Sequence, residues 1–225
     1  MKNTIAAATI LLLGACSSST PDAAKVLRDG AGAMAKLSTV SATLKLTKGT
    51  ISIQGFALVS AKTSVRLPSD SDTVYVVKEK DVTIGLEVVI SGGHVYLHVP
   101  FSPFQELSGD TAAAFPDMAK LFDRKNGLPA MIPGGRNPQY VSTDQVGGKS
   151  AYQVSATYTP EQVRGLLAEL SSSGPVAARV WVDTSSQLIR KAVLTGAFGD
   201  NGTAAGVEVD ITGFDAPVVI TSPTA

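Results

Sequence analysis

The sequence predicts an α+β protein: a single large curved antiparallel sheet, a half-barrel, with a few helices on its concave face that enclose an apolar cavity. Alternating apolar and polar residues mark about ten strands, most of them joined by tight turns. Such a sheet is roughly 48 Å wide at about 4.8 Å per strand, whereas three helical segments cover roughly 30 Å at about 10 Å each. Because soluble proteins rarely leave so much apolar surface in water, the helices are expected to stand off the sheet and enclose a pocket. The alternative is a sheet that closes tightly on side chains and helices alone.

The N-terminal stretch predicts a lipoprotein signal. Lys2 precedes an apolar run of about ten residues, Ile5 to Leu13, which is too short to span a bilayer and has the proportions of a signal-peptide core. Leu13-Gly14-Ala15-Cys16 then places two small residues before the single cysteine of the chain and resembles a bacterial lipobox. An inert core thiol is the alternative for Cys16, but its place in the chain favours lipidation.

This signal divides the chain into three parts. Residues 1–15 are predicted to be the lipoprotein signal peptide, and residues 16–20 the lipidated N-terminus with a short tether. Residues 21–225 are predicted to form one domain, which is long enough to bury about 70% of its surface without a disulfide.

The domain is predicted to begin with a helix. Thr20-Pro21-Asp22 supplies a cap, a proline at the first helical position and an acid in the first turn. Apolar residues then recur at helical spacing, at Val26, Leu27, Ala31, Met34 and Leu37. Gly30 and Gly32 each weaken this helix by roughly 1 kcal/mol relative to alanine, so packing must support it.

Period-two patterns predict strands up to residue 99. They cover 40–47, 51–58 with a bulge at Gly55, 62–67 and 73–78. The clearest pattern has Val82, Ile84, Leu86, Val88 and Ile90 on one face, and a turn at residues 91–93 joins it to a strand with Val95, Leu97 and Val99. His94 and His98 are expected on the solvent face with Tyr96, about 13 Å apart, which is too far to share one metal ion.

The second half mixes short helices with a second group of strands. From Pro100 the strand pattern stops for about forty residues, and short helices are predicted at 117–122 and 128–132. Strands are predicted at 140–143 and 152–158, and a helix begins at Thr159-Pro160-Glu161 with Val163, Leu166, Leu167 and Leu170 on one stripe. Strands at 178–182, 187–195 and 207–211 follow, with 218–220 as an added edge.

Charge and motif content exclude several classes of function. Nineteen basic residues balance nineteen acidic ones without a basic run, which argues against nucleic-acid binding. The Gly148-Lys149-Ser150 triplet lacks the first glycine of a phosphate loop, since Thr143 stands there. No serine elbow occurs, and acidic pairs such as Asp70 with Asp72 are typical of turns. We therefore predict a protein that is not an enzyme, with no catalytic residue, no metal site and no cofactor.

Several segments resemble the mycobacterial lipoprotein family of LppX, LprA, LprF and LprG. Residues 121–128 are similar to the family's D-P-x-x-G-L segment, with Arg124 in place of the proline, and residues 144–150 to its turn into a central strand. Val180-Trp181-Val182 matches its V-W-I strand, and Pro217-Val218 its closing P-V. The family's tryptophan near the end is replaced by Phe214, and the leader is shorter than the long linkers of relatives.

This resemblance implies a function as well as a fold. It implies a half-barrel whose apolar cavity holds multi-acyl lipids or glycolipids, which relatives carry or hand over in the cell envelope. It also implies a lipid anchor on the extracytoplasmic face of the cell membrane, with a membrane transporter as a candidate partner. A surface-anchored interaction protein with a filled core and no lipid cargo is the alternative, and a solid interior would favour it. A third possibility is an enzyme that hydrolyses lipids, but the sequence offers no nucleophile and no base for that reaction.

The lining of the cavity is predicted from inward-facing apolar residues, each of which could equally be ordinary core. The predicted lining residues are Leu44, Leu46, Ile84, Leu86, Val88, Val95, Leu97, Met118, Leu121, Val154, Leu167, Val180 and Val209.

Overall fold

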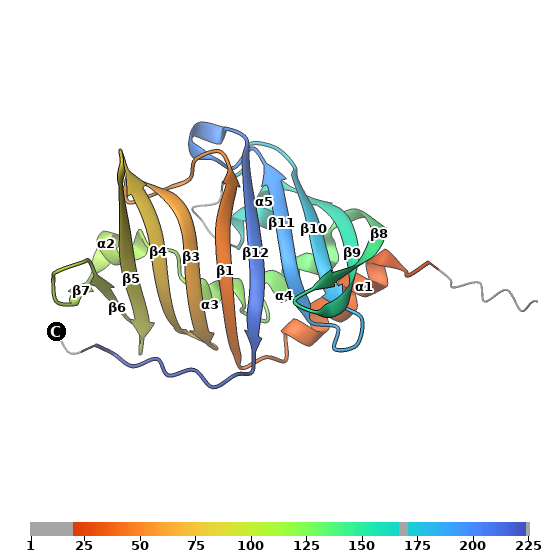
Figure 1. Cartoon of the computed structure of the whole chain (residues 1–225), viewed down its shortest axis with the longest axis horizontal. Helices are drawn as coiled ribbons and strands as arrows, with labels where there is room; N and C mark the ends of the chain where they lie inside the picture. The colour runs from red at the N-terminus through yellow and green to blue at the C-terminus, as the bar shows by residue number, and fades with distance from the viewer. Residues whose placement is uncertain (1–19, 167–170, 224–225) are drawn as a thin grey trace, which may run out of the picture.

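The computed structural model describes residues 20–166 and 171–223, and within these residues twelve strands form one open antiparallel sheet (Figure 1). The strands are β1 (Thr39–Lys48), β2 (Ser52–Ile53), β3 (Phe56–Arg66), β4 (Asp70–Glu79), β5 (Val82–Ser91), β6 (His94–His98), β7 (Gln105–Leu107), β8 (Arg136–Val146), β9 (Lys149–Tyr158), β10 (Val176–Asp183), β11 (Ile189–Gly196) and β12 (Ala205–Phe214).

The sheet consists of two meanders that meet at its centre. Its order is β7-β6-β5-β4-β3-β1-β12-β11-β10-β9-β8, with β2 paired to β3 off this path. β1 pairs with β3 on one side and with β12 on the other, so the first and last long strands of the chain form the seam. The prediction of a single large antiparallel sheet with few helices is confirmed, and the sheet is open.

The helices are short. They are α1 (Ala23–Met34), α2 (Gly109–Ala113), α3 (Met118–Leu121), α4 (Leu128–Met131), the 3₁₀ turn η1 (Ile132–Gly134), α5 (Pro160–Arg164) and the 3₁₀ turn η2 (Asp200–Gly202). In Figure 1, α2 to α5 lie behind the sheet, whereas the turn η2 stands at its upper end. α1 packs against β8–β11, and α3 packs against β3 and β4, so each half of the sheet has its own helical cover.

α1 has a side-chain cap at its N-terminus and lies close to the sheet at one glycine. Asp22 is the N-cap, and its side chain accepts a hydrogen bond from the Lys25 amide at 3.1 Å. Gly30 faces the sheet, where an added Cβ would lie 3.2 Å from Ile189 and 3.3 Å from Val182. The glycine therefore lets the helix approach β10 and β11.

The strands near residue 55 differ from the prediction. Gln54 and Gly55 both have positive φ, 54° and 83°, so the chain makes a tight turn there and not a bulge. A two-residue β2 precedes the turn, and β3 then runs unbroken through residue 66, where two strands were predicted. The bulge lies further on, between Leu58 and Ser60.

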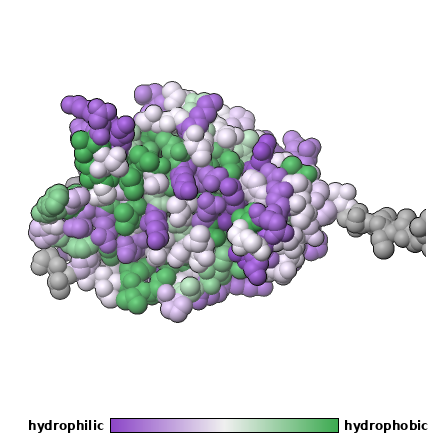
Figure 2. All heavy atoms as spheres, in the orientation of Figure 1, coloured by the Kyte–Doolittle hydropathy of each residue, from purple (hydrophilic) through white to green (hydrophobic). Residues whose placement is uncertain are grey.

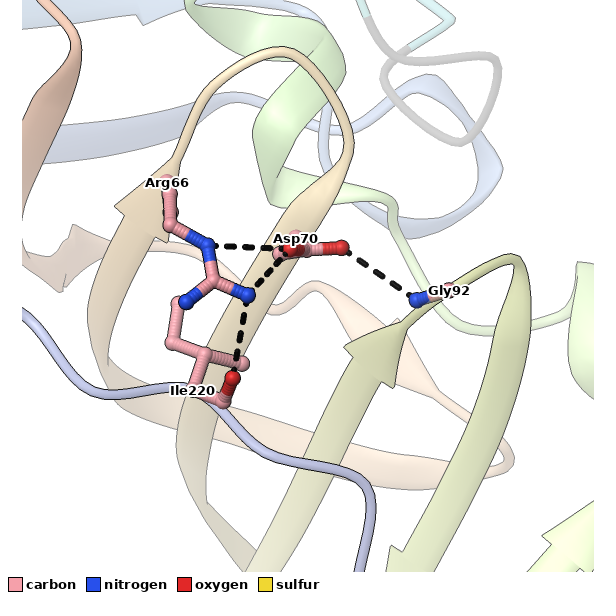
Figure 3. Close-up of polar contacts among 4 residues, drawn as sticks. All are labelled: Arg66, Asp70, Gly92 and Ile220. Carbon is pink, nitrogen blue, oxygen red and sulfur yellow. Dashed lines mark hydrogen bonds and ion pairs between the residues drawn. The ribbon is translucent and has the colours of Figure 1, made fainter.

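The C-terminal segment crosses the end of the sheet and does not add an edge strand. The Arg66 guanidinium donates to the Asp70 carboxylate at 2.6 Å and to the Ile220 carbonyl at 3.0 Å, while the Gly92 amide donates to Asp70 (Figure 3). The hydrogen bond from Arg66 is the main reason why the pKa of Asp70 is lowered. Ile220 packs on Val89 and Tyr96, which explains why Tyr96 is buried although it faces outward.

The two faces of the sheet differ in polarity. The inner face and the helices share one hydrophobic core that runs from Ala23 to Ile211. On the outer face, hydrophilic residues gather over β1, β12 and β11 and hydrophobic ones toward the ends of β3–β5 (Figure 2). Along the longest axis, α1 begins at one end of the molecule and β5–β7 lie at the other (Figure 1).

Candidate functional site

An apolar pocket, the inner cavity, lies between the inner face of the sheet and the short helices. Its volume is about 160 Å³. The sheet contributes residues of β1–β4 and β10–β12, and α3, α4 and α5 contribute from the opposite side. Its lining comprises Ala42, Leu44, Ile51, Ser52, Ile53, Gln54, Leu58, Ala61, Tyr75, Ala114, Pro116, Met118, Leu121, Phe122, Leu128, Val163, Leu166, Val176, Leu194, Phe198, Val207 and Val209.

The lining of the inner cavity carries few polar groups. Ser52, Gln54 and the hydroxyl of Tyr75 are its polar side-chain groups, and none of the described residues that line it is charged. The Tyr75 hydroxyl donates a hydrogen bond to the Pro116 carbonyl at 3.2 Å, so that group is engaged with the protein. Such a surface favours hydrocarbon over polar ligands, because a buried polar ligand group without a partner is costly.

Side-chain caps hold the helical side of the cavity in place. The Asp117 carboxylate accepts from the Ala119 amide at 3.0 Å and starts α3, which carries Met118 and Leu121 into the lining. Thr159 and Gln162 form a capping box at the start of α5, so that Val163 and Leu166 face the cavity.

A second space, the edge groove, lies beside the inner cavity at the β5–β6 end of the sheet. Its volume is about 630 Å³, and it is more open than the inner cavity. Its lining comprises Gln54, Phe56, Val82, Thr83, Ile84, Gly85, Leu86, Leu97, Val99, Pro100, Phe101, Thr111 and Phe115. A third space, the helix cleft, lies between α2, α3, α5 and the β5–β6 hairpin.

The structure divides the predicted lining residues among these spaces. Leu44, Met118, Leu121 and Val209 line the inner cavity. Ile84, Leu86 and Leu97 line the edge groove, and Val95 lines the helix cleft.

The remaining predicted residues lie elsewhere. Val88, Val154 and Val180 face inward but are buried in the core and line none of these three spaces. Leu46 is partly buried and packs against the same core. Leu167 and Cys16 lie outside the described residues.

Several lining residues were not predicted from the sequence. Val163 and Leu166 belong to the helical stripe from which Leu167 was chosen, so that stripe already contained the signal. Val207 lies two residues from Val209 on the same face of β12. Ile53 and Phe198 lie in a two-residue strand and a loop, where no periodicity marks the inward side.

The titratable groups on the outer side of β5–β7 form ordinary surface pairs. His94 and Glu106 are 2.7 Å apart, and His98 and Glu87 are 3.3 Å apart, so the two histidines have separate carboxylate partners. Burial, followed by the nearby Glu87 charge, raises the pKa of Asp72.

Among residues 20–166 and 171–223, no three His, Cys, Asp or Glu side chains are grouped to hold a metal ion. Within the same ranges, no helix is long and apolar enough to cross a membrane.

Comparison with known proteins identifies one family and a set of similar solved structures, among them two mycobacterial lipoproteins. The sequence profile of the LppX_LprAFG lipoprotein family matches residues 22–220. LprF from Mycobacterium bovis is 18% identical, with a TM-score of 0.73 over 92% of this chain and 100% of that chain. The lipoprotein LppX from Mycobacterium tuberculosis is 16% identical, with a TM-score of 0.65 over 88% of this chain and 97% of that chain. No curated protein matches the sequence.

Proposed function

Because the chain belongs to the LppX_LprAFG lipoprotein family, we propose that it is a membrane-anchored protein that binds lipids by their acyl chains and carries or hands them over in the cell envelope. The observation that carries this proposal is the inner cavity, an uncharged apolar space between sheet and helices. The lipids that we propose are multi-acyl lipids or glycolipids, and a membrane transporter is a candidate partner.

The energetics of transfer suit such a lining. Burying one methylene group is worth about 0.8 kcal/mol relative to water. An acyl chain therefore gains strongly over water in the cavity, but close to nothing over the interior of a bilayer. A carrier needs only to match the membrane for transfer to be reversible, and an apolar surface with few polar groups does so.

The size of the inner cavity limits what it holds in this conformation. Its volume of about 160 Å³ is close to that of a benzene-binding cavity of about 150 Å³ and below the roughly 300–1,000 Å³ of usual ligand sites. An acyl lipid therefore requires the helices to move outward or the use of the adjoining spaces. The helices on this side are four or five residues long, and elements with few buried contacts open at low cost.

Mass spectrometry of the lipid content tests this function. The full chain, purified from its native membrane in mild detergent, is expected to carry acyl lipid in a defined ratio to protein. The small inner volume is the observation that favours the alternative, a surface interaction protein without cargo. Protein that carries no lipid above the level of an unrelated lipoprotein prepared in parallel would contradict the carrier role and leave that alternative.

The membrane anchor is proposed from the lipobox. We propose that residues 1–15 are removed and that the Cys16 thiol is acylated, which places residues 21–225 at the extracytoplasmic face of the cell membrane. The mass of the N-terminal peptide tests this, and the expected peptide begins at Cys16 and carries the acyl groups. An N-terminal peptide that begins elsewhere, or an unmodified thiol, would contradict it.

A further inference from the structure

β5 extends beyond β6 at the edge of the sheet, and the edge groove lies along the exposed part. β6 pairs with β5 over Glu87 to Ser91. Pro100 has no amide hydrogen to continue the pairing, and Phe101, with a φ of 68°, turns the chain away. Residues 82–86 therefore pair with β4 on one side and, within the described part of the chain, with no strand on the other.

The groove has the size and the lining of a site for a hydrocarbon chain. Its volume of about 630 Å³ falls within the usual range for ligand pockets, roughly 300–1,000 Å³. The floor and walls are apolar and are formed by Phe56, Ile84, Leu86, Leu97, Val99 and Phe115. At the rim, Val82 is 60% exposed and Phe101 is fully exposed, although phenylalanine is usually buried.

Phe115 lines the edge groove, and its neighbours in the chain line the inner cavity. Gln54 lines both spaces, and Ala114 and Pro116 line the inner cavity while Phe115 between them lines the groove. The Phe115 ring is buried, with its centroid 6.4 Å from that of Tyr75, which lines the inner cavity. Phe115 also lines the helix cleft. One side chain therefore borders the groove and the cleft and stands beside the cavity.

The segment before Phe115 contributes little to the hydrophobic core. No residue of α2, all of which lies in the described part of the chain, is buried. The helix begins at Gly109, which has a φ of 56°, and Phe115 is the first buried residue that follows it. Displacing residues 109–115 therefore exposes little apolar surface apart from the Phe115 ring, and such segments open at low free-energy cost.

We propose that the edge groove is a second acyl-chain site, continuous with the inner cavity when Phe115 moves, and that lipid reaches the cavity along it. This inference rests on the proposed lipid-binding function and assigns the groove to one chain of a membrane lipid. The joined space is several times larger than the inner cavity alone, so it admits an acyl chain that the inner cavity cannot hold by itself. The unpaired edge of residues 82–86 would also suit an extended peptide. The position of the groove beside the inner cavity, with Gln54 lining both, favours the hydrocarbon chain.

Lipid transfer between vesicles tests the role of the groove. The full chain is reconstituted into acceptor vesicles of phosphatidylcholine and phosphatidylglycerol, and donor vesicles of the same composition carry a phospholipid with a pyrene-labelled acyl chain. Phe115→Ala removes the ring that we propose to act as the gate and is expected to raise the transfer rate about tenfold, because opening of such gates sets the rate of exchange. Ile84→Trp fills the groove and is expected to lower the rate about fivefold or more and to reduce the acyl chains bound per protein.

Two further variants distinguish the effect of filling the groove from the effect of general damage to the fold. Thr111→Trp fills the groove from α2, where no core contact is lost, and is expected to act as Ile84→Trp does. Val59→Trp, at an exposed position of β3 on the outer face, is expected to transfer lipid as the wild type does. If lipid is bound but Ile84→Trp, Thr111→Trp and Phe115→Ala all transfer at the wild-type rate, the groove does not conduct lipid, and a peptide site becomes its remaining use. If the wild type binds no lipid, the proposed function fails and this inference fails with it.

Discussion

Replacing Leu44 or Val209 by tryptophan is expected to abolish most lipid binding. The two residues face each other across the β1–β12 seam, and both line the inner cavity. A tryptophan at either position fills space that an acyl chain would occupy. Displacing as few as two methylene groups costs about 1.6 kcal/mol, which corresponds to more than a tenfold loss of affinity. Titration with the fluorescent fatty acid cis-parinaric acid measures this loss.

The controls for this prediction use the other face of the sheet. Val59→Trp adds the same ring on the outer face of β3, where the side chain is exposed, and is expected to bind the probe as the wild type does. Overpacking costs about 1–3 kcal/mol, so thermal unfolding must show that the Leu44 and Val209 variants remain folded. Wild-type affinity in folded Leu44→Trp and Val209→Trp proteins would place the ligand outside the inner cavity.

Asp183→Asn is expected to make the protein less stable at neutral pH and to remove part of its acid sensitivity. Asp183 ends β10, and its carboxylate accepts hydrogen bonds from the Ser185 and Ser186 amides and from Arg190 Nε at 2.6 Å. Burial alone would raise the pKa of this carboxyl. The hydrogen bonds from Ser186, Arg190 and Ser185, together with the Arg190 charge, outweigh burial and lower the pKa to about 2.

The sign of the pH effect follows from that lowered pKa. The folded protein prefers the ionised carboxylate, so the stabilisation is complete above the unfolded pKa near 4 and is lost as the pH falls toward about 2. Its size is about 2 kcal/mol. Urea unfolding at pH 7, 4, 3 and 2.5 should therefore show curves for wild type and Asp183→Asn that converge at low pH. Asp81→Asn, at an exposed turn, is the control, and a constant difference between wild type and Asp183→Asn at all four pH values would contradict the prediction.

Sequence periodicity predicted the sheet well because its strands have one buried face. The alternation at Val82 to Ile90 and its return at Val95 to Val99 correspond to the β5–β6 pairing. Periodicity could not predict the turn at Gln54 and Gly55, because a positive φ at glutamine has no sequence signal of that kind. β7 and α2 were also missed, since residues 100–113 combine proline, glycine and polar residues without a period.

The candidate site was harder to predict than the fold. Alternation identifies which side chains face inward, and Val88, Val154 and Val180 do so. It does not tell how far the helical layer stands from each of them, and these three are covered by neighbouring side chains. Residues such as Phe198 and Phe115 reach these spaces from loops, where position depends on tertiary contacts. The lining of a cavity between two layers therefore requires the structure.

The long axis of the molecule bears on where cargo can be exchanged. The described chain starts beside α1 at one end of this axis, and β5 and β6, which help to line the edge groove, lie at the other end (Figure 1). If Cys16 anchors the α1 end to the membrane, a domain with its long axis perpendicular to the membrane holds the edge groove away from that membrane. A domain with its long axis parallel to the membrane holds the groove close to it. Uptake and release of lipid would then differ only in the orientation of the domain, and the protein could exchange lipid with either surface while it stays anchored.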